Sequence, residues 1–222
     1  MSCVDSSLWV KICGLKQPEQ AVAIARLGAN AIGFISVRSS PRYVAPSQMR
    51  AISNALLAHS LDVERVGVFA NADLATISDA VAVGQLTALQ LHGQESLEVC
   101  ATIREAYPTL KLIKAFRIRS EADLQSTLPY EKTVDALLLD AYHPQLLGGT
   151  GQTIDWSYLK AFQPNIPWFL AGGLTPDNIQ RSLTLLSPDG IDVSSGVEVS
   201  PGNKSLEKVQ CLFAALRCEG DL

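Results

Sequence analysis

Eight short apolar runs divide this chain at regular intervals, and this spacing constrains the fold more than any other feature of the sequence. Each run holds four or five residues with little of the alternation of a half-exposed strand, which is typical of strands buried on both faces. Their midpoints lie roughly 22 to 34 residues apart, which leaves room for a helix between successive strands. The runs are Trp9–Ile12, Ala31–Ile35, Arg65–Phe69, Ala88–Leu91, Leu112–Ala115, Ala136–Leu139, Trp168–Ala171 and Gly190–Val193.

The segments between the runs carry helix signals. After Pro18, a residue accepted in a first helical turn, apolar residues between positions 21 and 28 follow a helical period. Ser120 and Asp123 have the spacing of a capping box. The segment Thr175-Pro176-Asp177 predicts a helix start with the threonine as N-cap.

Eight strands that alternate with helices must pair in parallel through right-handed crossovers. An open doubly wound sheet and an eight-stranded barrel both satisfy this rule. Eight regular units in 222 residues, without a long insertion, favour the barrel at the compact end of its size range. We therefore predict an α/β protein with a single (β/α)8 TIM-barrel domain over residues 1–222, with residues 1–8 and 219–222 as frayed termini.

The composition excludes several classes of partner. A formal net charge of −4, without any basic run, argues against nucleic acid and against an anionic membrane surface. No apolar stretch approaches the roughly 20 residues that span a bilayer. The five cysteines form no CxxC pair and are odd in number, which fits a reducing compartment. We expect a cytoplasmic protein without a signal peptide.

In such a barrel the chemistry lies at the carboxyl ends of the strands. Two clusters there, Gly172-Gly173 and Ser194-Ser195-Gly196, follow the seventh and eighth runs. Glycines allow a backbone to approach an anion, and barrel enzymes often bind phosphate with these two loops. The alternative is that the glycines only make tight turns. Because two clusters occur together, we predict a phosphorylated small-molecule substrate.

Two candidates for proton transfer end the sixth and first runs. Asp140 follows three leucines, and a carboxyl group partly removed from water suits a general acid. A helix cap and a metal ligand are the alternatives, but no His/Asp/Glu cluster accompanies Asp140, so we predict no metal. Cys13 stands at a strand tip, two residues after Lys11, whose charge is expected to lower the thiol pKa.

Three roles are open to Cys13. A nucleophile would need a histidine base that no motif supplies, and an inert core thiol would not need the polar surroundings. A general base needs only a fraction of thiolate. Cys13 and Asp140 on opposite walls of the barrel would then relocate a proton, which indicates an isomerase. Lys11 is also considered as a Schiff-base lysine.

Arg42 and His92 are weaker candidates. Arg42 lies in the loop after the second run, where its planar fork suits a carboxylate, although a solvated arginine is the commoner case. His92 follows the fourth run, where it either lines the pocket or is a hydrogen-bonded structural residue.

Eight segments carry most of the candidate residues and occur in a fixed order along the chain. They are Val10–Leu15, Ser40–Val44, Val66–Phe69, Leu89–Gly93, Leu137–Asp140, Gly148–Gly151, Ala171–Leu174 and Asp192–Glu198. In this order they resemble the phosphoribosylanthranilate isomerase family of tryptophan biosynthesis, and the resemblance spans residues 10 to 198, nearly the whole chain.

The resemblance implies a cofactor-free Amadori rearrangement of N-(5-phosphoribosyl)anthranilate to 1-(2-carboxyphenylamino)-1-deoxyribulose 5-phosphate. By this analogy Asp140 is the general acid and Cys13 the general base. Arg42 would hold the anthranilate carboxylate, and the last two strand ends the phosphate. The amine nitrogen belongs to the substrate, so no Schiff base is needed and Lys11 keeps an electrostatic role.

Rival functions are another phosphosugar-converting barrel enzyme and a barrel that binds a phosphometabolite without turning it over. An indole-glycerol-phosphate synthase relative would carry a catalytic lysine and glutamate, and a ribulose-phosphate epimerase would carry aspartates with metal-binding histidines. Neither set is evident at the strand ends. The sequence is compatible with a monomer or a homodimer, and the glycines of Tyr142–Gly151 would allow that loop to close over substrate.

Overall fold

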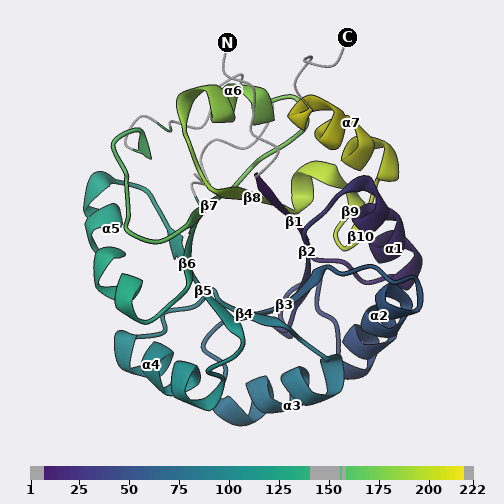
Figure 1. Cartoon of the computed structure of the whole chain (residues 1–222), viewed down its shortest axis with the longest axis horizontal. Helices are drawn as coiled ribbons and strands as arrows, with labels where there is room; N and C mark the ends of the chain where they lie inside the picture. The colour runs from purple at the N-terminus through teal and green to yellow at the C-terminus, as the bar shows by residue number, and fades with distance from the viewer. Residues whose placement is uncertain (1–7, 141–155, 157–158, 218–222) are drawn as a thin grey trace.

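The computed structural model describes residues 8–140, 156 and 159–217, and its eight parallel strands close into a barrel (Figure 1). The strands pair in sequence order, and the eighth pairs with the first. Each predicted apolar run is a strand, so the predicted barrel is confirmed. The strands are β1 (Trp9–Cys13), β2 (Ala31–Ile35), β3 (Glu64–Phe69), β4 (Ala88–Leu91), β5 (Lys111–Arg117), β6 (Ala136–Asp140), β7 (Trp168–Ala171) and β8 (Gly190–Val193).

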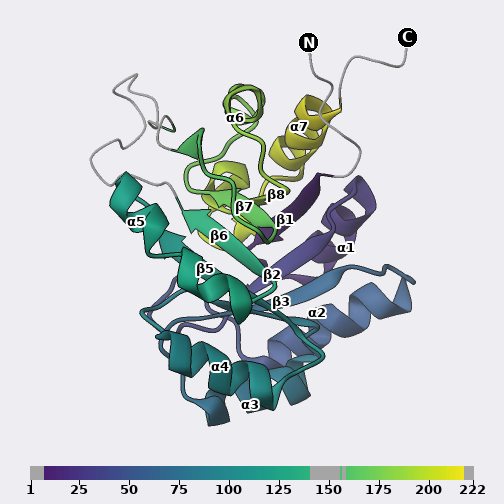
Figure 2. The same cartoon turned by 60° about the vertical axis from the view of Figure 1, so that its left-hand side comes forward.

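Helices surround the barrel (Figure 2). They begin where local chemistry satisfies the first turn: Pro18 opens one helix, and the side chains of Asp73, Ser96 and Ser205 cap three others. The helices are α1 (Pro18–Leu27), α2 (Pro46–Ala58), α3 (Leu74–Gly84), α4 (Leu97–Ala106), α5 (Glu121–Gln125), α6 (Ile179–Leu185) and α7 (Leu206–Leu216), with a 3-10 helix η1 (Leu128–Lys132). None of them is long and apolar enough to cross a membrane within the described part of the chain.

One predicted capping motif is confirmed and one predicted helix start is wrong. Ser120 and Asp123 form the capping box of α5. The helix α6, however, begins at Ile179 rather than after Thr175. The side chain of Asn178 accepts from the Thr175 N–H at 2.9 Å and donates to the Gly173 carbonyl at 2.9 Å, so the preceding residues form a turn.

The core has two layers. The larger lies between the strands and the helices, and the smaller fills the barrel interior. Trp9 stacks on Phe169 with ring centroids 4.4 Å apart at the amino end of the strands. Because this interior is packed, the site at the opposite end has a closed floor. The interior layer is Ala31, Val66, Ala88, Ile113, Ala115, Ala136, Leu138, Phe169 and Ala171.

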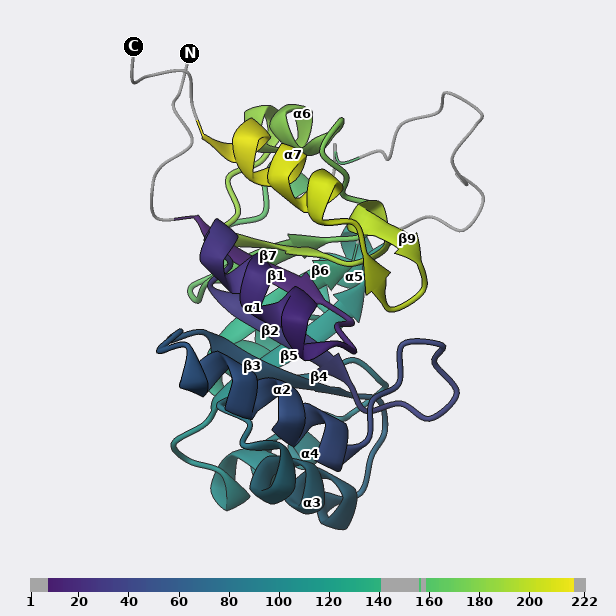
Figure 3. The ribbon, with the colours of Figure 1, turned by 90° about the vertical axis from the view of Figure 1, so that its right-hand side faces the viewer.

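A short hairpin that the sequence did not predict separates β8 from α7 (Figure 3). It follows the 3-10 helix η3 (Ser195–Val197) and pairs β9 (Glu198–Ser200) with β10 (Asn203–Lys204) in antiparallel fashion. The hairpin places two charged residues, Glu198 and Lys204, beside the end of β1, as described below.

Some predictions concern residues outside the described parts of the chain. These are the glycine cluster Gly148–Gly151, the loop Tyr142–Gly151 and, apart from Leu8, the termini predicted to be frayed. The extent of the domain over residues 1–222 stays a prediction.

Candidate active site

A cavity of about 470 Å³ opens at the carboxyl ends of the strands. It brings together eight of the ten residues predicted for the site, although they come from six different strand ends. Gly196 and Lys11 do not line it. The eight are Cys13, Arg42, His92, Asp140, Gly172, Gly173, Ser194 and Ser195.

Lys11 lies inside the barrel beneath Cys13, because residues two positions apart on the strand β1 point to the same face of the sheet. Its ammonium group is fully buried and donates to Asp192 Oδ2 and to Gln90 Oε1, both at 2.7 Å. Burial acts to lower the pKa of Lys11, but the Asp192 carboxylate outweighs it and raises the pKa. A lysine held protonated is a poor nucleophile, so this geometry supports an electrostatic role for Lys11 over a Schiff base.

Burial raises the pKa of the Cys13 thiol, and the positive charge of Lys11 offsets this only in part. Cys13 is 5% exposed, so a thiolate there loses most of its hydration. Lys11 does act to lower the thiol pKa, as expected, but burial outweighs this effect and the thiol pKa lies above its ordinary value. In the unliganded protein near neutral pH, Cys13 is a thiol.

Gly33 makes room for this pair from the neighbouring strand. It stands opposite Cys13 in the β1–β2 register, and an added Cβ would lie 2.6 Å from the Cys13 sulfur and 3.0 Å from Lys11 Cε. Any larger residue would push the thiol away from its observed position.

Because the added methyl group would displace the Cys13 sulfur, we expect Gly33→Ala to lower the kcat of any reaction that uses this thiol by roughly tenfold or more. Overpacking should also destabilise the fold by about 1–3 kcal/mol. Steady-state kinetics and thermal unfolding measure the two effects. Gly84→Ala is the control, since its Cβ would meet Met49 at 3.1 Å, far from the site. Equal losses of activity in both variants would contradict a specific role for Gly33.

A chain of hydrogen bonds links Lys11 to His92. Lysine only donates, so Gln90 accepts through Oε1 and presents its NH₂ group to His92 Nδ1 at 3.0 Å. His92 Nδ1 is then the acceptor, and the neutral ring carries its proton on Nε2. That nitrogen lies 3.7 Å from Asp140 Oδ2, and the half-buried carboxyl group faces the cavity. His92 therefore orients toward Asp140.

The two glycine clusters meet at the end of β7 and β8. Gly172 and Gly173 have φ values of 96° and 64°, in the left-handed region that favours glycine. Gly196 packs so closely on the Leu174 carbonyl that an added Cβ would lie 1.8 Å from its oxygen. The Ser194 hydroxyl donates to the Cys13 carbonyl at 3.0 Å. This loop pair is compact, and the binding of an anion by its backbone groups stays a prediction.

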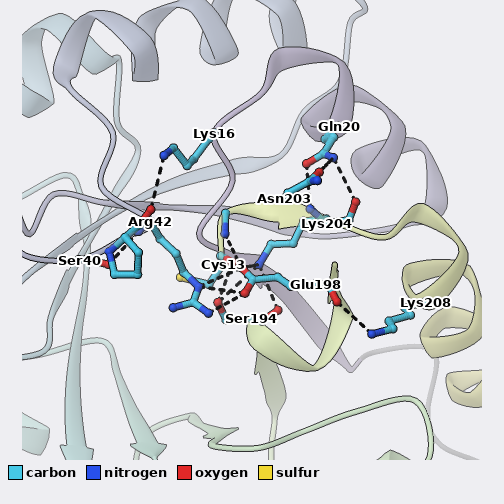
Figure 4. Close-up of polar contacts among 12 residues, drawn as sticks. Cys13, Lys16, Gln20, Ser40, Arg42, Ser194, Glu198, Asn203, Lys204 and Lys208 are labelled. Atoms are coloured by element: carbon cyan, nitrogen blue, oxygen red, sulfur yellow. Dashed lines mark hydrogen bonds and ion pairs between the residues drawn. The ribbon is translucent and has the colours of Figure 1, made fainter. Parts of the chain in front are cut away.

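Arg42 reaches the cavity from the loop after β2 and is held by Glu198 (Figure 4). Its Nε donates to Glu198 Oε1 at 2.9 Å and its Nη2 to Oε2 at 2.6 Å. Lys204 Nζ donates to the same carboxylate at 2.8 Å. The cavity thus carries a cationic group near Cys13 in addition to the glycine-rich loops.

The family model for N-(5'phosphoribosyl)anthranilate (PRA) isomerase matches residues 10–215. A relative from Acaryochloris marina, named N-(5'-phosphoribosyl)anthranilate isomerase, is 58% identical over 207 residues, which cover 92% of this chain and 95% of the relative. The chain belongs to the N-(5'-phosphoribosyl)anthranilate isomerase family.

Two crystal structures of this family have the same fold. That of phosphoribosyl anthranilate isomerase from Thermotoga maritima has a TM-score of 0.83 and 35% identity, covering 94% of this chain and 98% of its own. The other, in complex with reduced 1-(o-carboxyphenylamino)-1-deoxyribulose 5-phosphate, has a TM-score of 0.79, 35% identity and the same coverage. The predicted family, an isomerase family of tryptophan biosynthesis, is confirmed.

The sequence analysis did not assign a role to four charged residues in or beside this cavity, which are Arg117, Asp192, Glu198 and Lys204. Asp192 stands inside an apolar run, and a buried carboxylate there was a signal for a functional residue. Glu198 ends the segment Asp192–Glu198 that carries the family resemblance, but no role was predicted for it, and Lys204 follows in the unpredicted hairpin. Asp192 lines the cavity, and its Oδ1 has no hydrogen-bond partner among the described residues.

The Glu198 carboxylate should make the stability of the protein sensitive to acid. Burial acts to raise its pKa, but hydrogen bonds from Arg42 and Lys204 outweigh it and hold the pKa at about 2, below the usual 4.5. A depressed folded-state pKa gives stability that is present above pH 4.5 and lost as pH falls toward 2. The loss should be roughly 3 kcal/mol at most.

Urea unfolding between pH 5.5 and 2.5 measures this loss, with the free energy of unfolding extrapolated linearly to zero urea at each pH. Glu198→Gln removes the titrating group, so its stability should fall less steeply over this range. Equal slopes for the two proteins would contradict the assigned ion pair.

A second cavity of about 510 Å³ opens beside β4 and β5 and shares His92 and Arg117 with the first. Its buried Lys114 and Glu95 are paired with each other at 3.1 Å, and neither Cys13 nor Asp140 lines it. Among the described residues, no group of three or more His, Cys, Asp or Glu side chains is placed to hold a metal ion. The first cavity is therefore the candidate active site.

Proposed function

We propose that this chain catalyses the Amadori rearrangement of N-(5'-phosphoribosyl)anthranilate to 1-(2-carboxyphenylamino)-1-deoxyribulose 5-phosphate. The observation that carries the proposal is one cavity lined by Cys13, by Asp140 and by groups suited to two anions. The substrate has an anion at each end, a carboxylate and a phosphate. The arrangement of the cavity therefore matches the substrate in both chemistry and charge.

Asp140 acts first in this proposal. Its carboxyl group donates a proton to the furanose ring oxygen. The lone pair of the substrate nitrogen forms a double bond to C1 as the bond from C1 to the ring oxygen breaks, which gives an open-chain iminium ion. The Cys13 thiolate then removes the C2 proton, and the electrons of the C–H bond neutralise the iminium as an enolamine. Protonation at C1 and loss of the hydroxyl proton at C2 give the ketone. The iminium cation acidifies C2, which is why a thiolate suffices as the base.

Cys13 is a thiol before the reaction, so in this proposal its proton passes to solvent when the iminium cation forms beside it, because that positive charge lowers the thiol pKa that burial had raised. Lys11 sits beneath the sulfur with its charge fixed by Asp192. A thiolate that forms during the reaction therefore has a permanent positive neighbour. In this proposal Lys11 stabilises the base without touching the substrate.

Binding groups lie on two sides of these reacting groups. Arg42 is proposed to bind the anthranilate carboxylate, and backbone groups of Gly172, Gly173 and residues 194–196 the phosphate. Asp192 lines the cavity, and its buried Oδ1 has no hydrogen-bond partner among the described residues, so this carboxylate is proposed to accept from a sugar hydroxyl. His92 beside Asp140 is proposed to contact the same part of the substrate.

The direct test is turnover of phosphoribosylanthranilate by the purified chain, followed by the loss of the substrate's fluorescence. We expect saturable turnover without added metal or cofactor. Binding of the substrate without turnover would instead favour a phosphometabolite-binding protein. Turnover of ribulose 5-phosphate in its place would favour another phosphosugar enzyme.

The compartment and the assembly also stay proposals. Cys13, Cys100 and Cys211 are all free thiols, which supports the reducing cytoplasm as the location. We propose a monomer or a homodimer that acts on a small phosphorylated molecule, with neither nucleic acid nor a membrane as partner.

A further inference from the structure

Arg42 is held along one edge of its guanidinium group (Figure 4). Nε donates to both oxygens of Glu198, at 2.9 and 3.1 Å, and Nη2 donates at 2.6 Å. Nη1 has no hydrogen bond to any described residue, although Arg42 lines the cavity. A fork fixed along the Nε edge leaves Nη1 and the second Nη2 proton for a ligand.

Glu198 is itself rigidly held, although it stands on a hairpin of only a few residues. Its side chain is 5% exposed and accepts from Lys204 Nζ at 2.8 Å and from the Gly202 N–H at 3.0 Å. Its backbone carbonyl accepts from Lys208 Nζ at 2.9 Å. The carboxylate therefore has a fixed position before any ligand arrives.

The hairpin is also tied to the catalytic strand. Lys204 Nζ donates to the Ser194 carbonyl at 3.1 Å, and the Ser194 hydroxyl donates to the Cys13 carbonyl at 3.0 Å. A continuous set of contacts thus joins Arg42, through Glu198 and Lys204, to the end of β1. The position of the guanidinium group is set relative to the thiol.

We infer that Glu198, anchored by Lys204, is a positioning residue that orients Arg42 to receive the carboxylate of the ligand. The inference rests on the proposed function, which assigns the anthranilate carboxylate to Arg42. Arginine has many rotamers, and a guanidinium that is already ordered loses less freedom on binding.

Charge alone would not explain this arrangement. A carboxylate beside Arg42 weakens the attraction of the site for a second carboxylate, and a lone arginine would be more strongly cationic. Lys204 compensates for Glu198, so the three side chains together keep one net positive charge. The carboxylate thus orients the fork without cancelling the charge that binds the ligand.

The test compares two ligands that differ only in the carboxylate. They are reduced 1-(2-carboxyphenylamino)-1-deoxyribulose 5-phosphate and its 1-phenylamino counterpart, and their Kd values are measured by calorimetry. The Kd of the phenylamino ligand divided by the Kd of the carboxyphenylamino ligand reports how much the carboxylate contributes to binding, and this quotient is the Kd ratio used below. In Glu198→Gln we expect this ratio to fall by roughly tenfold or more, the scale of a charge-assisted hydrogen bond, with little change for the phenylamino ligand.

Glu198→Gln leaves the buried Lys204 without its carboxylate, so a gentler variant is measured beside it. Glu198→Asp keeps the negative charge for Lys204 but withdraws the oxygens from Arg42 by one methylene. It should also lower the Kd ratio. Loss of affinity for both ligands in equal measure, in both variants, would mean that Glu198 only supports the fold and would overturn the inference.

Arg42→Ala separates failure of this inference from failure of the proposed function. If Arg42→Ala leaves the Kd ratio unchanged, Arg42 does not bind the carboxylate, and that part of the proposed function is wrong. If Arg42→Ala brings the Kd ratio close to unity while both Glu198 variants keep the ratio of the parent protein, only the positioning role of Glu198 is wrong.

Discussion

Replacing Cys13 by alanine should lower kcat for phosphoribosylanthranilate by about 10³-fold, within the range for loss of a general base. The thiol lines the cavity, lies above the fixed charge of Lys11 and has no histidine hydrogen-bonded to it among the described residues. Deprotonation at C2 then has no base better than water. The affinity for reduced 1-(2-carboxyphenylamino)-1-deoxyribulose 5-phosphate should change little, because a product analogue needs no proton removed.

Cys100→Ala is the matched control for this variant. Cys100 is another fully buried thiol, whose pKa burial raises to about 11, but it lies in α4 within the outer core. Its loss should leave kcat unchanged at a similar cost in stability. Turnover near that of the parent protein by Cys13→Ala would show that another group removes the proton.

The barrel could be predicted because each of its strands is buried on both faces and therefore appears in the sequence as a continuous run of apolar residues. A strand covered on both faces is apolar at each position, and the run Leu137-Leu138-Leu139 carries that signal without any tertiary information. The same rule predicts which residues share an end of the barrel. Cys13 and Asp140 line one cavity because parallel strands bring all their carboxyl ends to one face.

The surroundings of these residues could not be predicted in the same way. Arg42 and Glu198 are 156 residues apart and meet only because a hairpin after β8 folds toward the loop after β2. No local pattern encodes such a pairing. The thiol pKa of Cys13 could not be predicted either. The sequence shows that Lys11 is nearby, but the larger effect on the pKa is burial, which depends on the closed barrel.

The predicted start of α6 was wrong for a local reason. The sequence offers several residues that could begin the helix, and it does not show which of them does so. Thr175-Pro176-Asp177 and Asn178 are all residues that begin helices. The Asn178 side chain bonds back to Thr175 and Gly173, which makes the turn more favourable than an earlier helix start. This turn keeps the glycine loop compact at the place proposed for the phosphate.

Asp140→Asn should also lower kcat by about 10³-fold, because an amide keeps the shape of the carboxyl group but cannot act as an acid. Steady-state kinetics measure the loss. Asp73→Asn is the matched control: it makes the same charge change at an exposed N-cap, where asparagine caps equally well. Parent-like turnover by Asp140→Asn would remove the assigned acid.

A substrate deuterated at C2 distinguishes the role of Asp140 from that of Cys13. Ring opening precedes deprotonation, so slowing it with Asp140→Asn makes breakage of the C2–H bond kinetically silent. The isotope effect on kcat should then approach unity in Asp140→Asn. In Cys13→Ser, whose hydroxyl is a far weaker base than a thiolate, the C2–H step limits turnover and the isotope effect should be fully expressed. The opposite pattern would exchange the two roles, with Asp140 as the base at C2.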